Sequence, residues 1–264
     1  MNNSKLETII KKKKETLEHR KKKLSLNLII SKLKNIKLDH RNFKQAIKRK
    51  KDRLSLIAEC KKASPSKGIL RANYDVEEIA KIYNSSKFVD AISVLTEENF
   101  FLGDIYHIIK AKTNTSLPIL RKDFIIDEYQ VYESIYYGAD AILLIANILE
   151  KEQLKSFYKI AKDLGLEVLF EVHTKEDIDK VLELEPEIIG INNRDLLTFK
   201  IDIHTTENLI KFIPKDITII SESGILSNKD ISYLYKIGVD AVLIGTYFMQ
   251  QENIQQAIEN LFKG

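Results

Sequence analysis

Carboxylates and ammonium groups end several short apolar segments of this sequence. Glu59 and Lys61 are two residues apart in one such segment, so an extended strand would place both on the same side. Lys122 and Glu171 end two later segments of the same kind. A positioned ammonium group can donate a proton and a carboxylate can accept one, so this set could perform general acid–base chemistry. Charged groups that converge on one site are costly to desolvate unless they pair or bind a ligand.

Two turns that contain glycine end the last two apolar segments, at Ser223-Gly224 and Gly245-Thr246. In a barrel of alternating strands and helices, backbone N–H groups after the seventh and eighth strands commonly bind phosphate, and a helix N-terminus there adds positive potential. We therefore predict that these four residues form a phosphate-binding site.

The elements that must position these residues repeat along the chain. From residue 54 onward, a β-branched or aliphatic run is followed each time by an amphipathic helical stretch, and the strand ends recur about every 27 residues. The predicted strands are residues 54–60, 89–95, 117–121, 141–145, 167–171, 188–191, 218–221 and 241–244. Eight such units favour a (β/α)8 TIM barrel over a doubly wound sheet, and they would bring the strand ends together at one mouth. The repeated joints at 137–141 and 237–241 are interpreted as scaffold turns.

Composition excludes several other classes of protein. The 264 residues include 44% hydrophobic side chains and carry a net charge of +4, which is typical of a folded domain. The longest apolar stretch, at 141–149, is far too short to cross a bilayer, and a single cysteine cannot form an internal disulfide, so we expect a cytoplasmic protein without a membrane span. The five histidines show no metal-ligand spacing, and dinucleotide and P-loop motifs are absent, so no metal or cofactor is predicted.

The first part of the chain differs in charge from the rest. Residues 1–53 carry 19 basic and 5 acidic groups, a net of +14, whereas residues 54–264 carry 23 basic and 33 acidic groups, a net of −10. We predict a basic helical extension at 1–53 and the barrel at 54–264, which together form one domain. Apolar residues near helical spacing in 6–24 favour a pair of amphipathic helices whose lysines face the acidic body. A nucleic-acid or membrane-surface binding arm is the alternative interpretation.

Six segments together resemble the indole-3-glycerol-phosphate synthase family of tryptophan biosynthesis. In chain order they are IAECKKASPSKG at 57–68, SVLTE at 93–97 with FLG at 101–103, LRKDF at 120–124, FEVH at 170–173, GINNRDL at 190–196 and SESGI at 221–225. The resemblance extends over the whole chain, including a lysine-rich N-terminal extension.

The resemblance implies a carbon–carbon lyase that needs no cofactor. The family closes the ring of 1-(2-carboxyphenylamino)-1-deoxyribulose 5-phosphate to form indole-3-glycerol phosphate, with loss of carbon dioxide and water. By resemblance, Lys122 is the general acid of the condensation and Glu171 the general base of the dehydration. Glu59 matches a carboxylate that holds lysines and substrate hydroxyls, and Lys61 a lysine that binds the substrate near its carboxylate or phosphate.

The remaining matches are to residues that contact the substrate. Asn192 matches a residue of the family's catalytic site that makes a polar contact with the substrate. The other expected substrate contacts are Ser64, Phe101, Phe124, Arg194 and Glu222, with both phenylalanines against the anthranilate ring. Ser223, Gly224, Gly245 and Thr246 match the family's phosphate-binding residues. A small-molecule substrate, no nucleic-acid partner and a monomer are expected.

Two other functions stay open at this point. Phosphoribosylanthranilate isomerase, another barrel enzyme that acts on a phosphosugar, would share the phosphate-binding end but not the combination of Glu59, Lys61, Lys122 and Glu171. A protein that binds nucleic acid through its basic extension, on an inert barrel, would leave those strand-end charges without a role. The two are distinguished by a substrate assay and by salt-sensitive binding to DNA or RNA.

Overall fold

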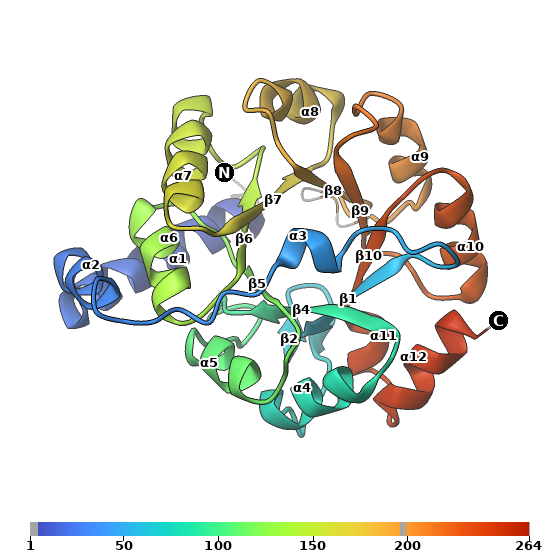
Figure 1. The fold of residues 1–264 in the computed structure, drawn as a ribbon, viewed down its shortest axis with the longest axis horizontal. Helices are drawn as coiled ribbons and strands as arrows, with labels where there is room; N and C mark the ends of the chain where they lie inside the picture. Colours follow the sequence, from blue (N-terminus) through green and yellow to red (C-terminus); the bar gives the residue numbers. More distant parts are fainter. Residues whose placement is uncertain (1–4, 196–197, 199, 264) are drawn as a thin grey trace.

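The computed structural model describes residues 5–195, 198 and 200–263. Within them, eight parallel strands close into a barrel in the order β1-β10-β9-β8-β7-β6-β5-β4, which confirms the predicted (β/α)8 fold (Figure 1). The strands are β1 (Ser55–Cys60), β4 (Val89–Leu95), β5 (Ile119–Lys122), β6 (Ala141–Ile145), β7 (Glu167–Val172), β8 (Ile188–Asn192), β9 (Thr218–Glu222) and β10 (Ala241–Ile244).

Helices surround the barrel and connect its strands. They are α4 (Val76–Ser85), α5 (Tyr106–Thr113), α6 (Glu128–Tyr136), α7 (Lys151–Asp163), α8 (Lys175–Leu182), α9 (His204–Ile210), α10 (Asn228–Lys236), the short α11 (Thr246–Met249) and α12 (Ile254–Phe262). Side-chain oxygens cap the first turns of several of them; Thr174 and Ser227 each form a reciprocal capping box at the start of α8 and α10.

The strands are apolar on both sides because each lies between the barrel interior and a helix. In β6, Leu143 packs in the inner core, whereas Ile142 and Leu144 pack in the outer core against the helices. The observed strand bounds agree with the predicted ones within two residues. β5 begins at Ile119 rather than two residues earlier, because Pro118 has no N–H to donate to the sheet.

The repeated joints at 137–141 and 237–241 have the same structure in both copies. Gly138 and Gly238 follow α6 and α10 with φ of 92° and 99°, a conformation that favours glycine. The side chains of Asp140 and Asp240 each accept a hydrogen bond of 2.8 Å from a backbone N–H of the preceding strand. The repeat therefore ties each helix end to the sheet.

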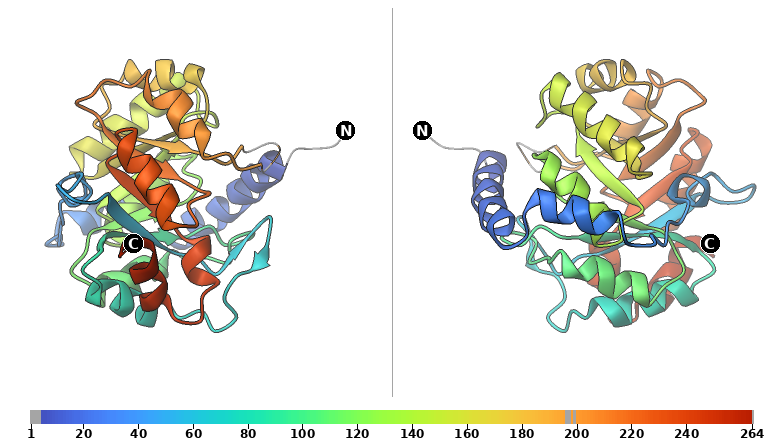
Figure 2. Two further views of the ribbon diagram at one scale, coloured as in Figure 1. Left: turned by 90° about the vertical axis from the view of Figure 1, so that its right-hand side faces the viewer. Right: turned by 60° about the vertical axis from the view of Figure 1, so that its left-hand side comes forward.

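Over its described residues, 5–53, the N-terminal extension contains three helices rather than the predicted pair: α1 (Lys5–Lys23), α2 (Leu26–Leu33) and α3 (Phe43–Ala46). α3 covers one opening of the barrel (Figure 1), where Phe43 and Ile47 are fully buried in the inner core. Figure 2 shows α1 and the segment that leads into β1 on opposite sides of the barrel. α2 packs beside α6, and the chain between α2 and β1 passes from one side to the other.

The lysine faces of the extension meet acidic groups of the barrel, as predicted. Lys21 lies 2.6 Å from Asp127, and Lys44 lies 2.6 Å from Glu187. Lys13 of α1 differs from the expected pattern, because its side chain is fully buried.

The segment around Ser64, an expected substrate contact, is a short antiparallel hairpin. Its strands are β2 (Ala63–Ser64) and β3 (Gly68–Ile69). Gly68 has φ 66°, the left-handed conformation that the return of this hairpin requires.

Candidate active site

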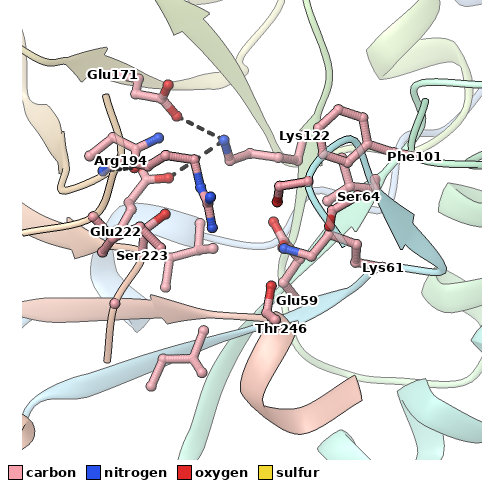
Figure 3. A pocket seen from close by; sticks show the side chains of 18 of the residues that line it. Glu59, Lys61, Ser64, Phe101, Lys122, Glu171, Arg194, Glu222, Ser223 and Thr246 are labelled. Atoms are coloured by element: carbon pink, nitrogen blue, oxygen red, sulfur yellow. Dashed lines mark hydrogen bonds and ion pairs between the residues drawn. The ribbon is translucent and has the colours of Figure 1, made fainter. Parts of the chain in front are cut away.

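The carboxyl ends of the barrel strands surround a cavity of about 540 Å³. Every site residue predicted from the sequence lines it: Glu59, Lys61, Ser64, Phe101, Lys122, Phe124, Glu171, Asn192, Arg194, Glu222, Ser223, Gly224, Gly245 and Thr246. Ten of these residues are labelled around the cavity in Figure 3. Residues that lie more than 180 positions apart in the chain thus share one pocket.

Lys122 lies at the centre of the charged residues. Its Nζ donates to Oε2 of Glu171 at 2.8 Å and lies 3.5 Å from Oε2 of Glu222 (Figure 3). The side chains of Glu171 and Glu222 are each only 2% exposed, so these charges interact with little screening by water. The three residues end or lie near the ends of β5, β7 and β9, and the barrel closure alone brings them together.

The surroundings shift the pKa values of the two carboxyls in opposite directions. Burial raises the pKa of Glu171, but the charges of Lys122 and His173 and hydrogen bonds from Lys122 and Asn192 outweigh it and lower the pKa to about 2. Burial raises the pKa of Glu222 to about 8, with the negative charges of Glu171 and Glu59 adding to the effect and Lys122 opposing it. These surroundings therefore favour the carboxylate form of Glu171 and the protonated form of Glu222.

Lys122 stays an ammonium group despite its position. Burial lowers its pKa, but the negative charges of Glu171, Glu222 and Glu59 raise the pKa above its usual range. A cation that is held protonated next to an ionised carboxylate is suited to donate a proton to a substrate, while the carboxylate accepts another.

Glu59 and Lys61 form a second pair across the cavity. Lys61 Nζ lies 2.5 Å from Glu59 Oε1, and Ser93 Oγ donates to the other carboxylate oxygen at 3.5 Å. Gly245 leaves room for this carboxylate, because a Cβ at position 245 would collide with Glu59. The predicted proximity on one side of β1 is therefore present.

Polar contacts come from three further residues. Asn192 hydrogen-bonds Glu171, and its Oδ1 accepts from the backbone N–H of Arg194 at 3.0 Å. Arg194 is partly buried, which lowers the pKa of its guanidinium, opposed by Glu59. Ser64 reaches the cavity from the β2–β3 hairpin. Leu196, the last residue of the family-like segment around Arg194, lies outside the described residues.

The predicted phosphate-binding turns form one wall of the cavity. Ser223 and Gly224 have φ of 68° and 80°, so two consecutive residues after β9 are left-handed. At Gly224 a side chain would also collide with Ile201. Gly245 precedes α11, which starts at Thr246, so the unpaired N–H groups of that first turn lie at the cavity wall.

The opposite part of the cavity is apolar. The rings of Phe101 and Phe124 have centroids 6.3 Å apart, and Phe101 lies on the side of Lys122 away from Glu171 (Figure 3). Leu6 and Ile9 of α1 complete this apolar end. These two residues were not among the predicted site residues, although their spacing of three in a lysine-rich segment marks an apolar helix face.

No helix within residues 5–195, 198 and 200–263 is both long and apolar enough to cross a membrane. No group of three or more His, Cys, Asp or Glu side chains among the same residues is arranged to hold a metal ion.

Comparison with known proteins places this chain in a family. The model of the family "Indole-3-glycerol phosphate synthase" matches residues 6–261. The indole-3-glycerol phosphate synthase of Thermoanaerobacter pseudethanolicus is 50% identical over 245 residues, which cover 93% of this chain and 92% of the relative. That of Clostridium kluyveri is 46% identical over 264 residues, covering 98% of this chain and 99% of the relative.

Solved structures share the fold at much lower identity. The 3-hexulose-6-phosphate synthase of Salmonella typhimurium superposes with a TM-score of 0.62 at 13% identity, covering 80% of this chain and 97% of that one. A chain of the tryptophan synthase complex of Pyrococcus furiosus gives a TM-score of 0.60 at 14% identity, covering 79% and 98%. These likenesses concern the barrel alone. The family match over nearly the whole sequence goes further: the chain belongs to the indole-3-glycerol phosphate synthase family.

Proposed function

We propose that this pocket carries out the carboxy-lyase reaction of the family, the ring closure of 1-(2-carboxyphenylamino)-1-deoxyribulose 5-phosphate to indole-3-glycerol phosphate. The observation that carries the proposal is the position of Lys122 Nζ, 2.8 Å from the Glu171 carboxylate in a cavity that is charged at one end and aromatic at the other. The substrate has the same division, with an arylamine at one end and a phosphosugar at the other.

The first step needs a proton donor. The aromatic carbon attacks the ketone of the sugar, and the ketone oxygen takes a proton as negative charge develops on it. Lys122 is a protonated donor at the centre of the cavity. Substrate binding places the ketone oxygen beside its Nζ, in place of part of the interaction with Glu171 and Glu222.

Loss of carbon dioxide restores the aromatic ring. The substrate carboxylate leaves as carbon dioxide, and its electron pair returns to the ring system. An apolar environment favours this step because it disfavours the localised carboxylate charge. Leu143 and Ile145 of β6 supply apolar surface on the cavity wall.

The last step removes water. Glu171, held as a carboxylate, takes a proton from the ring system while the hydroxyl leaves with a proton from an ammonium group. Lys61, just after β1, and Lys122, at the end of β5, both face the cavity. Glu59 holds Lys61 in place, and Glu222, as a neutral acid, can donate a hydrogen bond to a substrate oxygen.

The ends of the substrate are bound by the two ends of the cavity. Phe101 and Phe124 pack on the arylamine ring, and Ser223, Gly224, Gly245 and Thr246 bind the phosphate through backbone N–H groups and hydroxyls. Ser64, Asn192 and Arg194 supply further polar contacts.

The test is a direct assay. The protein, treated with EDTA and given 1-(2-carboxyphenylamino)-1-deoxyribulose 5-phosphate alone, should form indole-3-glycerol phosphate, detected by indole fluorescence. Phosphoribosylanthranilate, the substrate of the isomerase considered above, should give no product. Product from the second substrate and none from the first would refute the proposal.

We also propose that the protein acts as a monomer in the cytoplasm without nucleic acid. All the predicted site residues come from one chain, and the single cysteine, Cys60, is a buried free thiol. Light scattering after size-exclusion chromatography should give a mass near 30.5 kDa. A salt-sensitive complex with DNA or RNA would contradict the last part.

A further inference from the structure

One buried lysine of the N-terminal extension connects the two segments that carry the cavity's aromatic rings. Lys13 of α1 is fully buried, whereas the other lysines of the run at 11–14 are exposed. It follows Ile9 by four residues and Leu6 by seven, so these three side chains lie on the same face of α1. The face that covers the aromatic end of the cavity therefore also carries a buried positive charge.

The ammonium group of Lys13 bridges two carboxylates of different segments. Its Nζ lies 2.7 Å from Oε2 of Glu98 and 2.7 Å from Oδ1 of Asp123. Glu98 is three residues before Phe101. Asp123 directly precedes Phe124, and the same Oδ1 accepts a 2.8 Å hydrogen bond from the backbone N–H of Phe124. Lys13 thus holds one side of each segment that supplies an aromatic ring.

These contacts are part of a closed ring of six alternating charges. Around the ring, each cation pairs with the carboxylates on both sides: Lys13, Glu98, Arg20, Glu133, Arg121 and Asp123. None of the six side chains is more than 25% exposed. A buried network of this kind is costly to break at any one member, because the partners keep their charges. The ring therefore fixes α1, the segment after β4 and the end of β5 against one another.

We infer that Lys13 is a positioning residue for the aromatic end of the cavity: by joining Glu98 to Asp123 it sets the separation of Phe101 and Phe124 and places Leu6 and Ile9 over them. This inference rests on the proposed function, in which that end binds the arylamine ring. Asp123 also directly follows Lys122, so the same contact fixes the strand end that carries the proposed acid.

The consequence of losing the charge follows from the geometry. Without the ammonium group, Glu98 and Asp123 repel one another and the two segments move apart. The apolar faces that enclose the arylamine ring then separate. The phosphate-binding turns belong to β9 and β10, which take no part in the ring of charges, so phosphate binding is retained.

The experiment compares Lys13→Met with Lys14→Met, a matched control at an exposed neighbour. Methionine keeps the length and apolar stem of the lysine side chain. Two quantities are compared for each variant: kcat/KM with the full substrate, from separate values of kcat and KM, and the inhibition constant of ribulose 5-phosphate, which has the phosphosugar but no aromatic ring. Because misplacement of about 1 Å can reduce a rate by about a hundredfold, kcat/KM of Lys13→Met should fall by at least about tenfold.

The inhibition constant of the ring-free sugar should stay within about twofold, as expected for distant, independent sites. Lys14→Met should match the unaltered protein in both quantities. An unchanged kcat/KM in Lys13→Met would overturn the inference, and equal weakening of both ligands would reduce Lys13 to a general structural role. Should Lys13→Met fail to fold, Glu98→Gln removes one of the two bridged carboxylates and must shift the same ratio in the same direction. If the unaltered protein forms no indole-3-glycerol phosphate, the proposed function fails, separately from the role of Lys13.

Discussion

Gly190 of β8 lies directly against the carboxyl group of Glu222 on the neighbouring strand β9. A Cβ at position 190 would collide with Glu222 Oε1 and lie 3.0 Å from Cδ1 of Leu169. The missing side chain at 190 therefore gives Glu222 the space in which it approaches Lys122.

Gly190→Ala should displace Glu222 and lower activity. We expect kcat/KM to fall by about ten- to a hundredfold, because a small misplacement of a positioned group is costly, and stability to fall by about 1–3 kcal/mol through overpacking. Steady-state kinetics and urea unfolding measure the two effects. The double variant with Glu222→Gln is the control: if the alanine acts through Glu222, the two losses in activity are not additive. Additive losses would show that Gly190 acts by another route.

Lys122→Ala tests the proposed proton donor. Removal of a positioned acid typically reduces turnover by about 10²- to 10⁴-fold, and kcat should fall within that range while the far-ultraviolet circular dichroism stays unchanged. Lys155→Ala, at an exposed position of α7, serves as the matched control and should retain full activity. A variant without Lys122 that turns over at the normal rate would disprove its role.

Glu222 should make stability depend on pH in the neutral range. Its pKa is raised from the ordinary 4.5 to about 8 in the folded protein. The folded state therefore holds a proton that the unfolded state releases between these pH values. The stability from this group is fully present below pH 4.5 and is lost as the pH rises through about 8. Free energies of unfolding in urea at pH 5, 7 and 9 should fall more steeply for the unaltered protein than for Glu222→Gln, which cannot titrate. Parallel pH dependences of the two proteins would contradict the assignment.

Much of the site could be predicted because, in a barrel of parallel strands, residues at the carboxyl ends of the strands lie close together in space. Glu59, Lys122, Glu171 and Glu222 each end or nearly end an apolar run, and parallel strands of one barrel bring such ends to one mouth. The resemblance to the family then suggested a role for each. The opposite pKa shifts of Glu171 and Glu222 could not be predicted, since they depend on burial and on three-dimensional neighbours.

The path of the extension was harder to predict. Leu6 and Ile9 belong to the apolar helical pattern in 6–24, but nothing local indicates which surface such a helix face covers. Lys13 belongs to a run of four lysines. Its position four residues after Ile9 and four before Leu17 predicts that it lies on the buried face of the helix, whereas the positive charge of the run favours exposure to solvent.

We propose that residues 1–53 and the barrel form one domain. Phe43 of α3 is fully buried in the inner core, at the end of the barrel away from the active site. Phe43→Ala should lower the free energy of unfolding by about 3–5 kcal/mol, since it removes a large side chain and leaves a cavity in a core shared with the strands.

Leu38→Ala, at a position that is 39% exposed in the same segment, is the control and should change stability much less. Urea unfolding followed by circular dichroism and by tyrosine fluorescence should give one coincident transition for Phe43→Ala, because α3 and the strands lose the same core. At a temperature where this variant is folded its kcat should stay near normal, since Phe43 touches none of the groups at the mouth. Two separate transitions, or a loss of kcat without a loss of stability, would mean that the extension folds apart from the barrel.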